Sequence, residues 1–201
     1  MTSHGAFEIS NSFVMIQDLP KMSLPKEPTT WNKDEYFIST DKSLISLSAL
    51  NSAFDSDMLY WSKPYPEDIL QEIINHSFCF GLYEAPDTTE PPETNSSSNS
   101  DLKTPRQIGF ARLVTDYITF AYLTDLYVLP EYQGKGFGGW LIDCVDELVK
   151  PLPHLRWIML RTSSVRSQES YKQRMSMEVL DSPDASQDAV TMGRRGRANL
   201  A

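Results

Sequence analysis

Residues 133–139, with the sequence QGKGFGG, contain four of the nine glycines of the chain. An amphipathic helical pattern over 137–149 follows at once. The first backbone N–H groups of a helix have no partner within it, and the helix dipole makes that end positive. Glycine lets an anion approach those N–H groups closely. The segment therefore predicts a binding site for a phosphate-bearing ligand.

Two common phosphate-binding motifs do not account for this segment. A Walker phosphate loop needs Ser or Thr directly after its Lys, but Gly136 and Phe137 follow Lys135. Gly134, Gly136 and Gly139 satisfy the G-x-G-x-x-G pattern of dinucleotide-binding folds by their letters. However, other residues separate the first glycine from the preceding strand pattern, and too little chain follows for the further strand–helix units of that fold.

A third interpretation counts from Val128. Val128, four further residues and then Gln133-x-x-Gly136-x-Gly138 resemble the pyrophosphate-binding motif of the GNAT superfamily, the acetyl-CoA-dependent N-acetyltransferases. The order of strand and helix patterns over 33–180 also resembles that of the family. The resemblance implies a mixed α/β fold, the GNAT fold, with a mixed central sheet of about six to seven strands and about four flanking helices.

The resemblance also implies acetyl-CoA as co-substrate and no metal. In the family, main-chain amides of the loop bind the pyrophosphate, and the pantetheine arm lies along the preceding strand, where one amide polarises the thioester carbonyl. The residues thereby implied in cofactor binding are Leu126, Tyr127, Val128, Gln133, Gly134, Lys135, Gly136, Phe137, Gly138, Gly139 and Ser164.

Two side chains are candidates for proton transfer when an amine attacks a thioester. Tyr171 matches the family's tyrosine on the helix after the fifth strand, which is positioned to protonate the leaving sulfur. Asp125 is an acid in an otherwise apolar strand, where a carboxylate is costly unless it is paired or used. It is therefore a candidate base, directly or through water, with a structural hydrogen bond as the alternative.

The pattern around Tyr171 departs from that of the family. Ser164, Ser167 and Ser170 stand where many members carry an asparagine, a small residue and a leucine, and RMSM replaces a later glycine–aromatic pair. Two hypotheses stay open. The first is an N-acetyltransferase that passes the acetyl group directly to a primary amine, on a small molecule, a lysine or an N-terminus, in a ternary complex. The alternative is a non-catalytic acyl-CoA-binding sensor or interaction module.

Aromatic and hydroxyl side chains supply candidates for the acceptor site. One lies in the segment between the first two helices, which shapes this site in the family, and the others lie on or near the long aromatic strand. These candidates are Trp61, Tyr117, Tyr122 and Thr124. A monomer or a homodimer is expected.

The composition narrows the partners. A net charge of −9 and a pI near 4.8 argue against a nucleic-acid binder and favour cationic partners such as amines. Cys79 and Cys144 lie in apolar runs and are expected to be reduced core residues of an intracellular protein. No apolar stretch approaches ~18 residues and no signal-peptide pattern occurs. We therefore expect a location in the cytoplasm or nucleus and no membrane partner.

The chain divides into a folded domain and less regular segments. We expect an irregular N-terminal arm over 1–30, the acetyltransferase domain over 31–181 and a flexible tail over 182–201. Residues 86–106 are rich in Pro, Ser, Thr and Asn and are expected to form a disordered hairpin insertion. The expected strands are 35–41, 78–85, 106–116, 117–129, 155–162 and 177–180, and the expected helices are 42–54, 65–77, 137–149 and 168–175.

Overall fold

The computed structural model describes residues 22–59, 61–86, 104–181 and 190–197. Eight strands form one sheet in the order β1-β2-β3-β4-β5-β6-β8-β7, and every pair is antiparallel except β5–β6. The strands are β1 (Thr30–Lys33), β2 (Tyr36–Ser39), β3 (Phe78–Glu84), β4 (Arg106–Thr115), β5 (Phe120–Val128), β6 (Trp157–Thr162), β7 (Glu178–Asp181) and β8 (Val190–Arg195). The α-helices are α1 (Leu47–Phe54), α2 (Glu67–Asn75), α3 (Phe137–Val149) and α4 (Val165–Met175), and the 3-10 turns are η2 (Lys42–Leu44), η3 (Asp57–Leu59) and η4 (Pro130–Tyr132).

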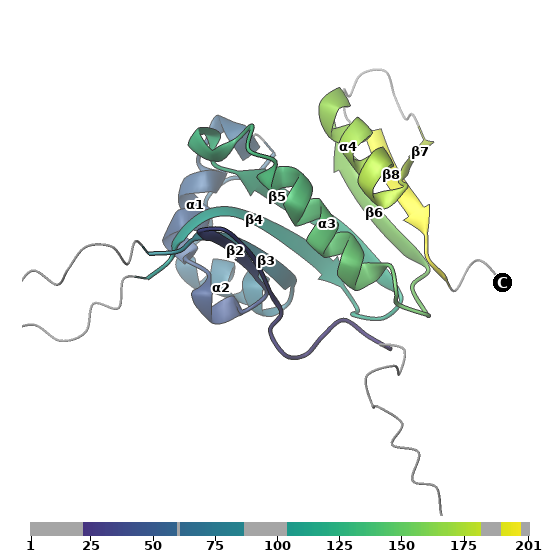
Figure 1. Cartoon of the computed structure of the whole chain (residues 1–201), viewed down its shortest axis with the longest axis horizontal. Coiled ribbons are helices and arrows are strands. Elements are labelled where there is room, and N and C mark those ends of the chain that lie inside the picture. The colour runs from purple at the N-terminus through teal and green to yellow at the C-terminus, as the bar shows by residue number, and fades with distance from the viewer. Residues whose placement is uncertain (1–21, 60, 87–103, 182–189, 198–201) are drawn as a thin grey trace, which may run out of the picture.

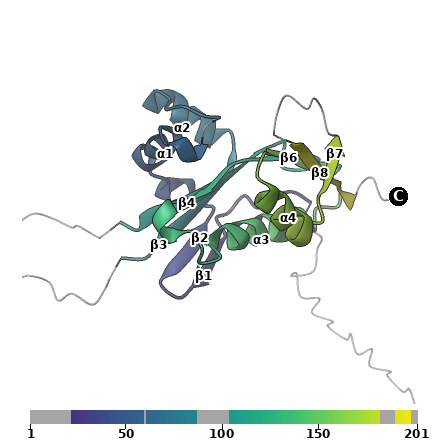
Figure 2. The same ribbon diagram turned by 90° about the horizontal axis from the view of Figure 1, so that it is seen from above.

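Helices cover both faces of the sheet. Figures 1 and 2 show α1 and α2 on one face and α3 and α4 on the other. Two separate apolar clusters fill these interfaces, one beneath α1 and α2 and a larger one beneath α3 and α4. The crossover from β5 through α3 to β6 joins the one parallel pair, as a parallel connection requires. The predicted mixed α/β fold is confirmed, with a slightly larger sheet than expected.

The helix α1 and the 3-10 turn η2 begin where a polar side chain bonds one of their first N–H groups. The predicted helix over 42–54 is two elements, because Ser46 accepts a hydrogen bond from the Ala49 N–H and starts α1. Asp41 starts the 3-10 turn η2 by accepting from the Ser43 N–H. The predicted helix over 137–149 has the expected bounds, and its apolar stripe is buried on the sheet.

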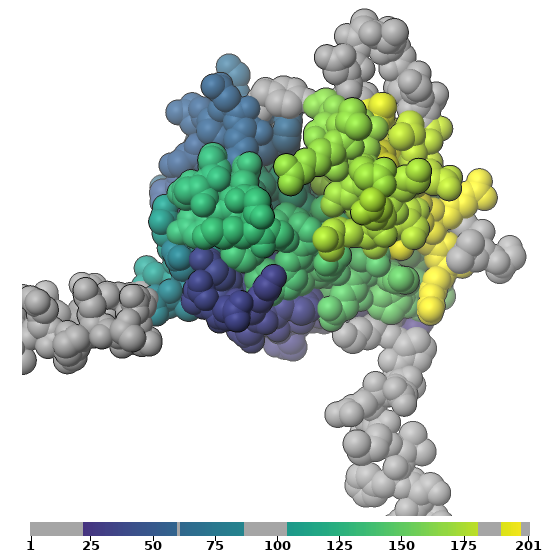
Figure 3. Space-filling view, turned by 45° about the horizontal axis from the view of Figure 1, so that its top comes forward, coloured from purple at the N-terminus to yellow at the C-terminus, as the bar shows by residue number. Residues whose placement is uncertain are grey.

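The C-terminal part of the domain corrects one prediction. Residues 190–195 were assigned to a flexible tail but form β8, which pairs with β6 and β7 (Figure 3, yellow). Met192 is buried in the core, and Arg194 forms an ion pair of 2.9 Å with Asp146 on α3. The polar composition concealed this strand because only alternate residues face the core. Residues 182–189 and 198–201 lie outside the described residues.

The N-terminal side holds a second correction. The strand β1 was not expected, and part of the predicted irregular arm belongs to the core, since Leu24 is only 1% exposed and its N–H donates to the Tyr117 carbonyl. Most of the predicted insertion, 87–103, and residues 1–21 lie outside the described residues. Among the described helices, none is long and apolar enough to cross a membrane.

Leu24 provides a test of how firmly the N-terminal segment belongs to the fold. Replacing Leu24 by Ala is expected to lower the free energy of unfolding by about 2 to 4 kcal/mol, because a buried leucine leaves a cavity. Met22→Ala is the control, since Met22 is 56% exposed and should change stability by less than about 0.5 kcal/mol. Urea unfolding followed by circular dichroism measures both, and equal effects would contradict the assignment of Leu24 to the core.

Candidate active site

The glycine-rich loop between η4 and α3 has the backbone shape of an anion cradle. Gly134 and Gly136 have φ values of 81° and 85°, in the left-handed region that glycine adopts without strain. A side chain built on Gly134, Gly136 or Gly138 would meet no atom within 4 Å. Since no neighbour requires glycine at these positions, the open space is available to a ligand that lies against the backbone.

The loop leads directly into the uncapped N-terminus of α3. Gly136 is the N-cap residue and offers no side chain, and the Trp140 N–H donates to the Gly136 carbonyl at 3.0 Å. The N–H groups of Phe137, Gly138 and Gly139 therefore have no partner within the helix. The Phe137 side chain is buried against Tyr36, with ring centroids 4.5 Å apart, so only its main chain faces the loop.

Gln133 fixes the loop to the end of β5. Its side-chain amide donates to the Val128 carbonyl at 2.9 Å and lies 4.0 Å from the Met58 sulfur of η3. The Gln133 side chain thus has a structural role in the motif, because its hydrogen bond joins the first residue of the loop to the last residue of the strand. The two motif positions identified from sequence, Val128 and Gln133, are in direct contact.

Three cationic side chains surround the first turn of α3 in a protein of net charge −9. The Lys135 ammonium lies 5.2 Å from the centroid of the Tyr132 ring, and Lys33 lies 5.9 Å from that of Trp140. The Arg174 guanidinium, from α4, pairs with Asp143 and lies where a side chain on Gly139 would be. A side chain at position 139 would therefore displace the Arg174 guanidinium, unlike one at the three preceding glycines.

The strand β5 has a free edge beside this loop. Its parallel pairing with β6 runs from Phe120↔Trp157 to Leu123↔Leu160 and then stops, although both strands continue. Within the described part of the chain, residues 124–128 therefore have no partner strand on the β6 side. This edge contains Leu126, Tyr127 and Val128, the residues implied from sequence to hydrogen-bond the pantetheine arm.

A β-bulge lies at the start of the free edge. Arg112 pairs with Thr124 and Phe110 pairs with Tyr127, so two residues of β5 oppose one residue of β4. Asp125, one of these two, has a φ of 53°, which Asp tolerates better than most residues. The bulge bends the strand at the position where its pairing with β6 has just ended.

Asp125 is held in a buried ion pair. One carboxylate oxygen accepts from Arg112 Nε at 2.7 Å and the other from the Thr124 hydroxyl at 3.1 Å, and the two ion-pair side chains are 18% and 9% exposed. Arg112 also donates to the Ser77 hydroxyl at 3.1 Å. Both carboxylate oxygens therefore accept hydrogen bonds. This arrangement is the one expected if Asp125 has a structural role instead of acting as the base.

Tyr171 is a buried phenol on α4. It is 7% exposed within the core cluster beneath α3 and α4, and burial raises its pKa to about 12. It therefore stays protonated at neutral pH. Ser164, implied in cofactor binding, is the N-cap of α4, and its hydroxyl oxygen accepts from the Ser167 N–H at 3.2 Å. The serines that replace the family's residues here thus provide a normal helix start.

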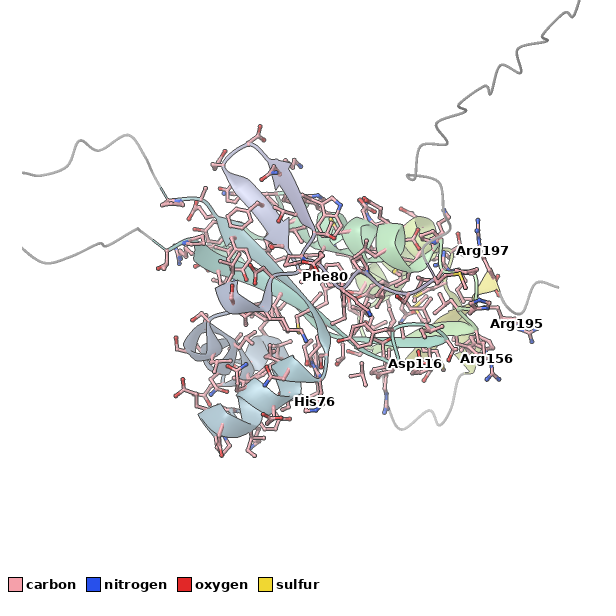
Figure 4. The ribbon with its side chains drawn as sticks, turned by 90° about the horizontal axis from the view of Figure 1, so that it is seen from below. His76, Phe80, Asp116, Arg156, Arg195 and Arg197 are labelled. Atoms are coloured by element: carbon pink, nitrogen blue, oxygen red, sulfur yellow. The ribbon has the colours of Figure 1, made fainter. Side chains whose placement is uncertain are left out.

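The structure brings only some of the acceptor-site candidates together. Tyr122 and Thr124 are half-buried on β5, and they alternate with core residues of the α3 side, so they face the side of α1 and α2. Trp61 is 54% exposed on the connection between α1 and α2. Tyr117 lies in the β4–β5 turn beside Asp116 (Figure 4), at the opposite end of β5 from the loop, with its ring against Phe78.

Sequence reasoning missed Arg112 and Arg174. Arg112 could have been found by the same signal as Asp125, because it too is a charged residue within an apolar strand. The two residues form an ion pair with each other. Nothing in the sequence distinguishes Arg174, because only the contact between α4 and α3 places it at Gly139. Among the described residues, no group of three or more His, Cys, Asp or Glu side chains has metal-ligand geometry.

Comparison with known proteins agrees with this geometry. The model of the acetyltransferase (GNAT) domain matches residues 102–174, which contain the loop, the free edge and α4. A protein of Gibberella zeae, provisionally named an acetyltransferase, is 39% identical over 137 residues, or 68% of this chain and 77% of the relative. The chain belongs to the GNAT family. Its loop, β5 edge and α4 are thus elements of a GNAT domain.

Solved structures share the fold of this GNAT domain. A protein of Xanthomonas campestris pv. campestris, provisionally assigned to the GNAT acetyltransferases, is 29% identical with a TM-score of 0.51, over 75% of this chain and 86% of that one. Spermidine N-acetyltransferase from Vibrio cholerae, solved with CoA and spermine, has a TM-score of 0.54 at 16% identity, over 84% and 100%. Arabidopsis thaliana NAA60, solved with acetyl-CoA, has a TM-score of 0.52 at 15% identity, over 84% and 97%.

The Arg112–Asp125 pair predicts a specific stability pattern. Asp125→Asn is expected to lower the free energy of unfolding by about 2 kcal/mol, because it leaves a mostly buried guanidinium without its counter-charge. Adding Arg112→Met should recover most of that loss. The control is Glu131→Gln, which breaks the exposed Arg106–Glu131 pair and should cost less than about 0.5 kcal/mol. Urea unfolding measures all three, and failure of the double variant to recover stability would argue against a structural pair.

Proposed function

We propose that this protein transfers the acetyl group of acetyl-CoA directly to a primary amine in a ternary complex. The observation that carries the proposal is the juxtaposition of two features. One is the open glycine loop at the uncapped start of α3, and the other is the free edge of β5 that ends at the same loop. Together they suit a ligand with a pyrophosphate followed by an extended amide-bearing arm, which is the chemistry of coenzyme A.

Main-chain groups would hold most of the cofactor. The N–H groups from Gln133 to Gly139 would bind the pyrophosphate at the positive end of α3, with Lys135 at the rim. The β5 edge at Leu126, Tyr127 and Val128 would bond the pantetheine arm as an added strand does, and one of its amides would stabilise the oxyanion of the tetrahedral intermediate. The CoA and acetyl-CoA complexes of the Vibrio and Arabidopsis structures support this assignment.

Tyr171 is proposed as the acid that protonates the departing sulfur. Burial keeps its phenol protonated, because its pKa is about 12. The two cysteines do not offer a covalent route, since Cys79 and Cys144 are buried and burial raises the pKa of each to about 12. A thiol that stays protonated is a poor nucleophile, which supports direct attack by the amine.

Asp125 is proposed as a positioning residue rather than the direct base. Taking a proton on its carboxylate would weaken the bonds from Arg112 and Thr124 within a mostly buried site. The ion pair instead holds the bulge, and with it the direction of the following residues of β5. Loss of the amine proton is then assigned to water beside Thr124 and Tyr122.

The acceptor is proposed to be a cationic primary amine. The net charge of −9 supports attraction of a protonated amine to the surface. The Vibrio enzyme was solved with a polyamine, spermine, and the Arabidopsis protein with acetyl-CoA, which agrees with the reaction class without selecting a substrate. A small amine, a lysine side chain and an N-terminal amine all fit the proposal, and a thiol-release assay over a panel of such amines distinguishes them.

The glycines of the loop separate folding from cofactor binding. Gly136→Ala is expected to lower both the melting temperature and acetyl-CoA affinity, because a left-handed alanine costs about 1 kcal/mol. Gly138→Ala lies in the first turn of α3 with open space around it, so it should leave the melting temperature unchanged. It should still weaken acetyl-CoA binding about tenfold, or about 1.4 kcal/mol, by keeping the phosphates away from the amides. Calorimetric titration and thermal unfolding measure the two effects, and wild-type affinity in Gly138→Ala would refute the binding mode.

Tyr171→Phe tests the catalytic proposal. It is expected to lower kcat about a hundredfold while leaving the acetyl-CoA Kd within about twofold, because only proton transfer is lost. In the wild type, kcat should show no loss with an apparent pKa near 10, since the acid form persists until the pH approaches about 12. If acetyl-CoA binds but the wild type acetylates no amine of a broad panel, the sensor alternative is favoured instead.

A further inference from the structure

A second cavity lies beside the proposed acetyl-CoA site, on the α1 face of the sheet. Its volume is about 910 Å³. It is bounded by α1 with its flanking 3-10 turns, by the first residues of β4 and the two residues before them, and by the end of β5 and the residues that follow, and it opens to solvent. None of the loop glycines lines it, and neither does Tyr171. Its lining includes Ser46, Ala49, Met58, Gln107, Tyr127 and Leu129.

The cavity is mainly apolar because α1 turns small side chains toward it. Ala49 and Ala53 face it from successive turns, and Met58 and Leu129 add apolar wall on either side. Larger residues on this face of α1 would close the space. A cavity of this size, whose surface is mainly apolar although serines and other polar residues also line it, is typical of a site for a small organic molecule.

The buried polar groups that line the cavity have a fixed order of hydrogen-bond donors and acceptors. The Ser46 N–H donates to the Gln107 carbonyl oxygen at 2.9 Å, so the Gln107 amide nitrogen must be the atom that donates to the Tyr127 hydroxyl at 3.4 Å. The hydroxyl thereby accepts, and its own proton has no acceptor among the described residues. Gln107 and Tyr127 are only 7% and 4% exposed. A buried hydroxyl proton without an acceptor is unfavourable, so a ligand oxygen placed there would be bonded.

The remaining polar groups define the ligand further. The Ser52 and Ser56 hydroxyls donate to carbonyls of α1, at 2.9 and 2.6 Å, and so are not donors to a ligand. Asp57 at the cavity has no ion-pair partner within 4 Å among the described residues, whereas Arg106 is paired with Glu131. The unbalanced carboxylate disfavours an anion. Tyr127 stays a donor at neutral pH, because burial raises its pKa to about 12.

We propose that this cavity is a second ligand site, for a neutral, mainly apolar molecule that places a carbonyl oxygen against the Tyr127 hydroxyl. The site is separate from the proposed acetyl transfer, because the cavity is lined by none of the acceptor-site candidates Trp61, Tyr117, Tyr122 and Thr124 and not by Tyr171. The acetyl-CoA site uses the strand's edge toward β6 and the start of α3. Binding to the cavity therefore needs neither acetyl-CoA nor turnover.

A matched pair of probes tests the site in the full chain without acetyl-CoA. The probes are 4-phenylbutan-2-one and butylbenzene, which share an apolar body and differ in the carbonyl. Both are titrated into isotope-labelled wild type and Tyr127→Phe, with amide chemical shifts giving the Kd and the location. Tyr127→Phe should weaken the ketone about fivefold and change the hydrocarbon Kd by less than about twofold, since one hydrogen bond is lost.

Two variants on α1 control for location. Ala49→Leu extends into the cavity and is expected to weaken both probes about tenfold, or about 1.4 kcal/mol. Ser48→Leu, on the exposed neighbouring residue, should leave both Kd values within about twofold. The proposal is overturned if neither probe binds saturably, if Ala49→Leu has no effect, or if Tyr127→Phe affects both probes equally. Acetyl-CoA affinity of the same wild-type sample, measured separately, shows whether the proposed function stands or fails on its own.

Discussion

The end of pairing between β5 and β6 after Leu123 and Leu160 is the constraint on which the site depends. A strand with a free edge inside a sheet exposes main-chain groups that need partners. In this domain the free edge leads within a few residues to the uncapped start of α3, whose N–H groups also lack partners. Two sets of unsatisfied groups therefore meet at one place. A ligand with phosphates and amides can satisfy both sets.

The surrounding residues hold these unpaired main-chain groups in place. Gln133 ties the loop to the Val128 carbonyl, so the loop keeps its position when no ligand holds it. Arg174 fits against Gly139 and pairs with Asp143, which fixes α4 on α3 beside the loop. Lys135 lies over the Tyr132 ring, and the Tyr132 hydroxyl donates to Glu84 at 2.6 Å. Each contact orders a positive or polar group in advance, which reduces the entropy lost on binding.

The sequence predicts well those features that depend on consecutive residues. The loop and α3 depend on glycine conformation and helical periodicity, both of which are written in consecutive residues, and α3 has the predicted bounds. The strand β8 was missed because its place rests on Met192 and Arg194 meeting residues far away in the chain. Tyr117 was grouped with the acceptor site as an aromatic residue of the predicted strand 117–129, but it stands at the start of that strand, whereas the loop follows its end. The roles of individual site residues remain predictions.

The bulge at Asp125 explains how β5 contributes residues to the two apolar clusters and to the ion pair with Arg112. Along regular β5, alternation would place Asp125 on the same side as Leu123, inside the core beneath α3. The extra residue shifts the alternation, so that Val128 joins that core while Tyr127 joins the cluster beneath α1. Asp125 can then reach Arg112 instead of an apolar core, and the Tyr127 hydroxyl reaches Gln107 at the second cavity. Because main-chain groups of the same residues point along the sheet toward β6, the bulge sets the proposed cofactor edge and the second cavity together.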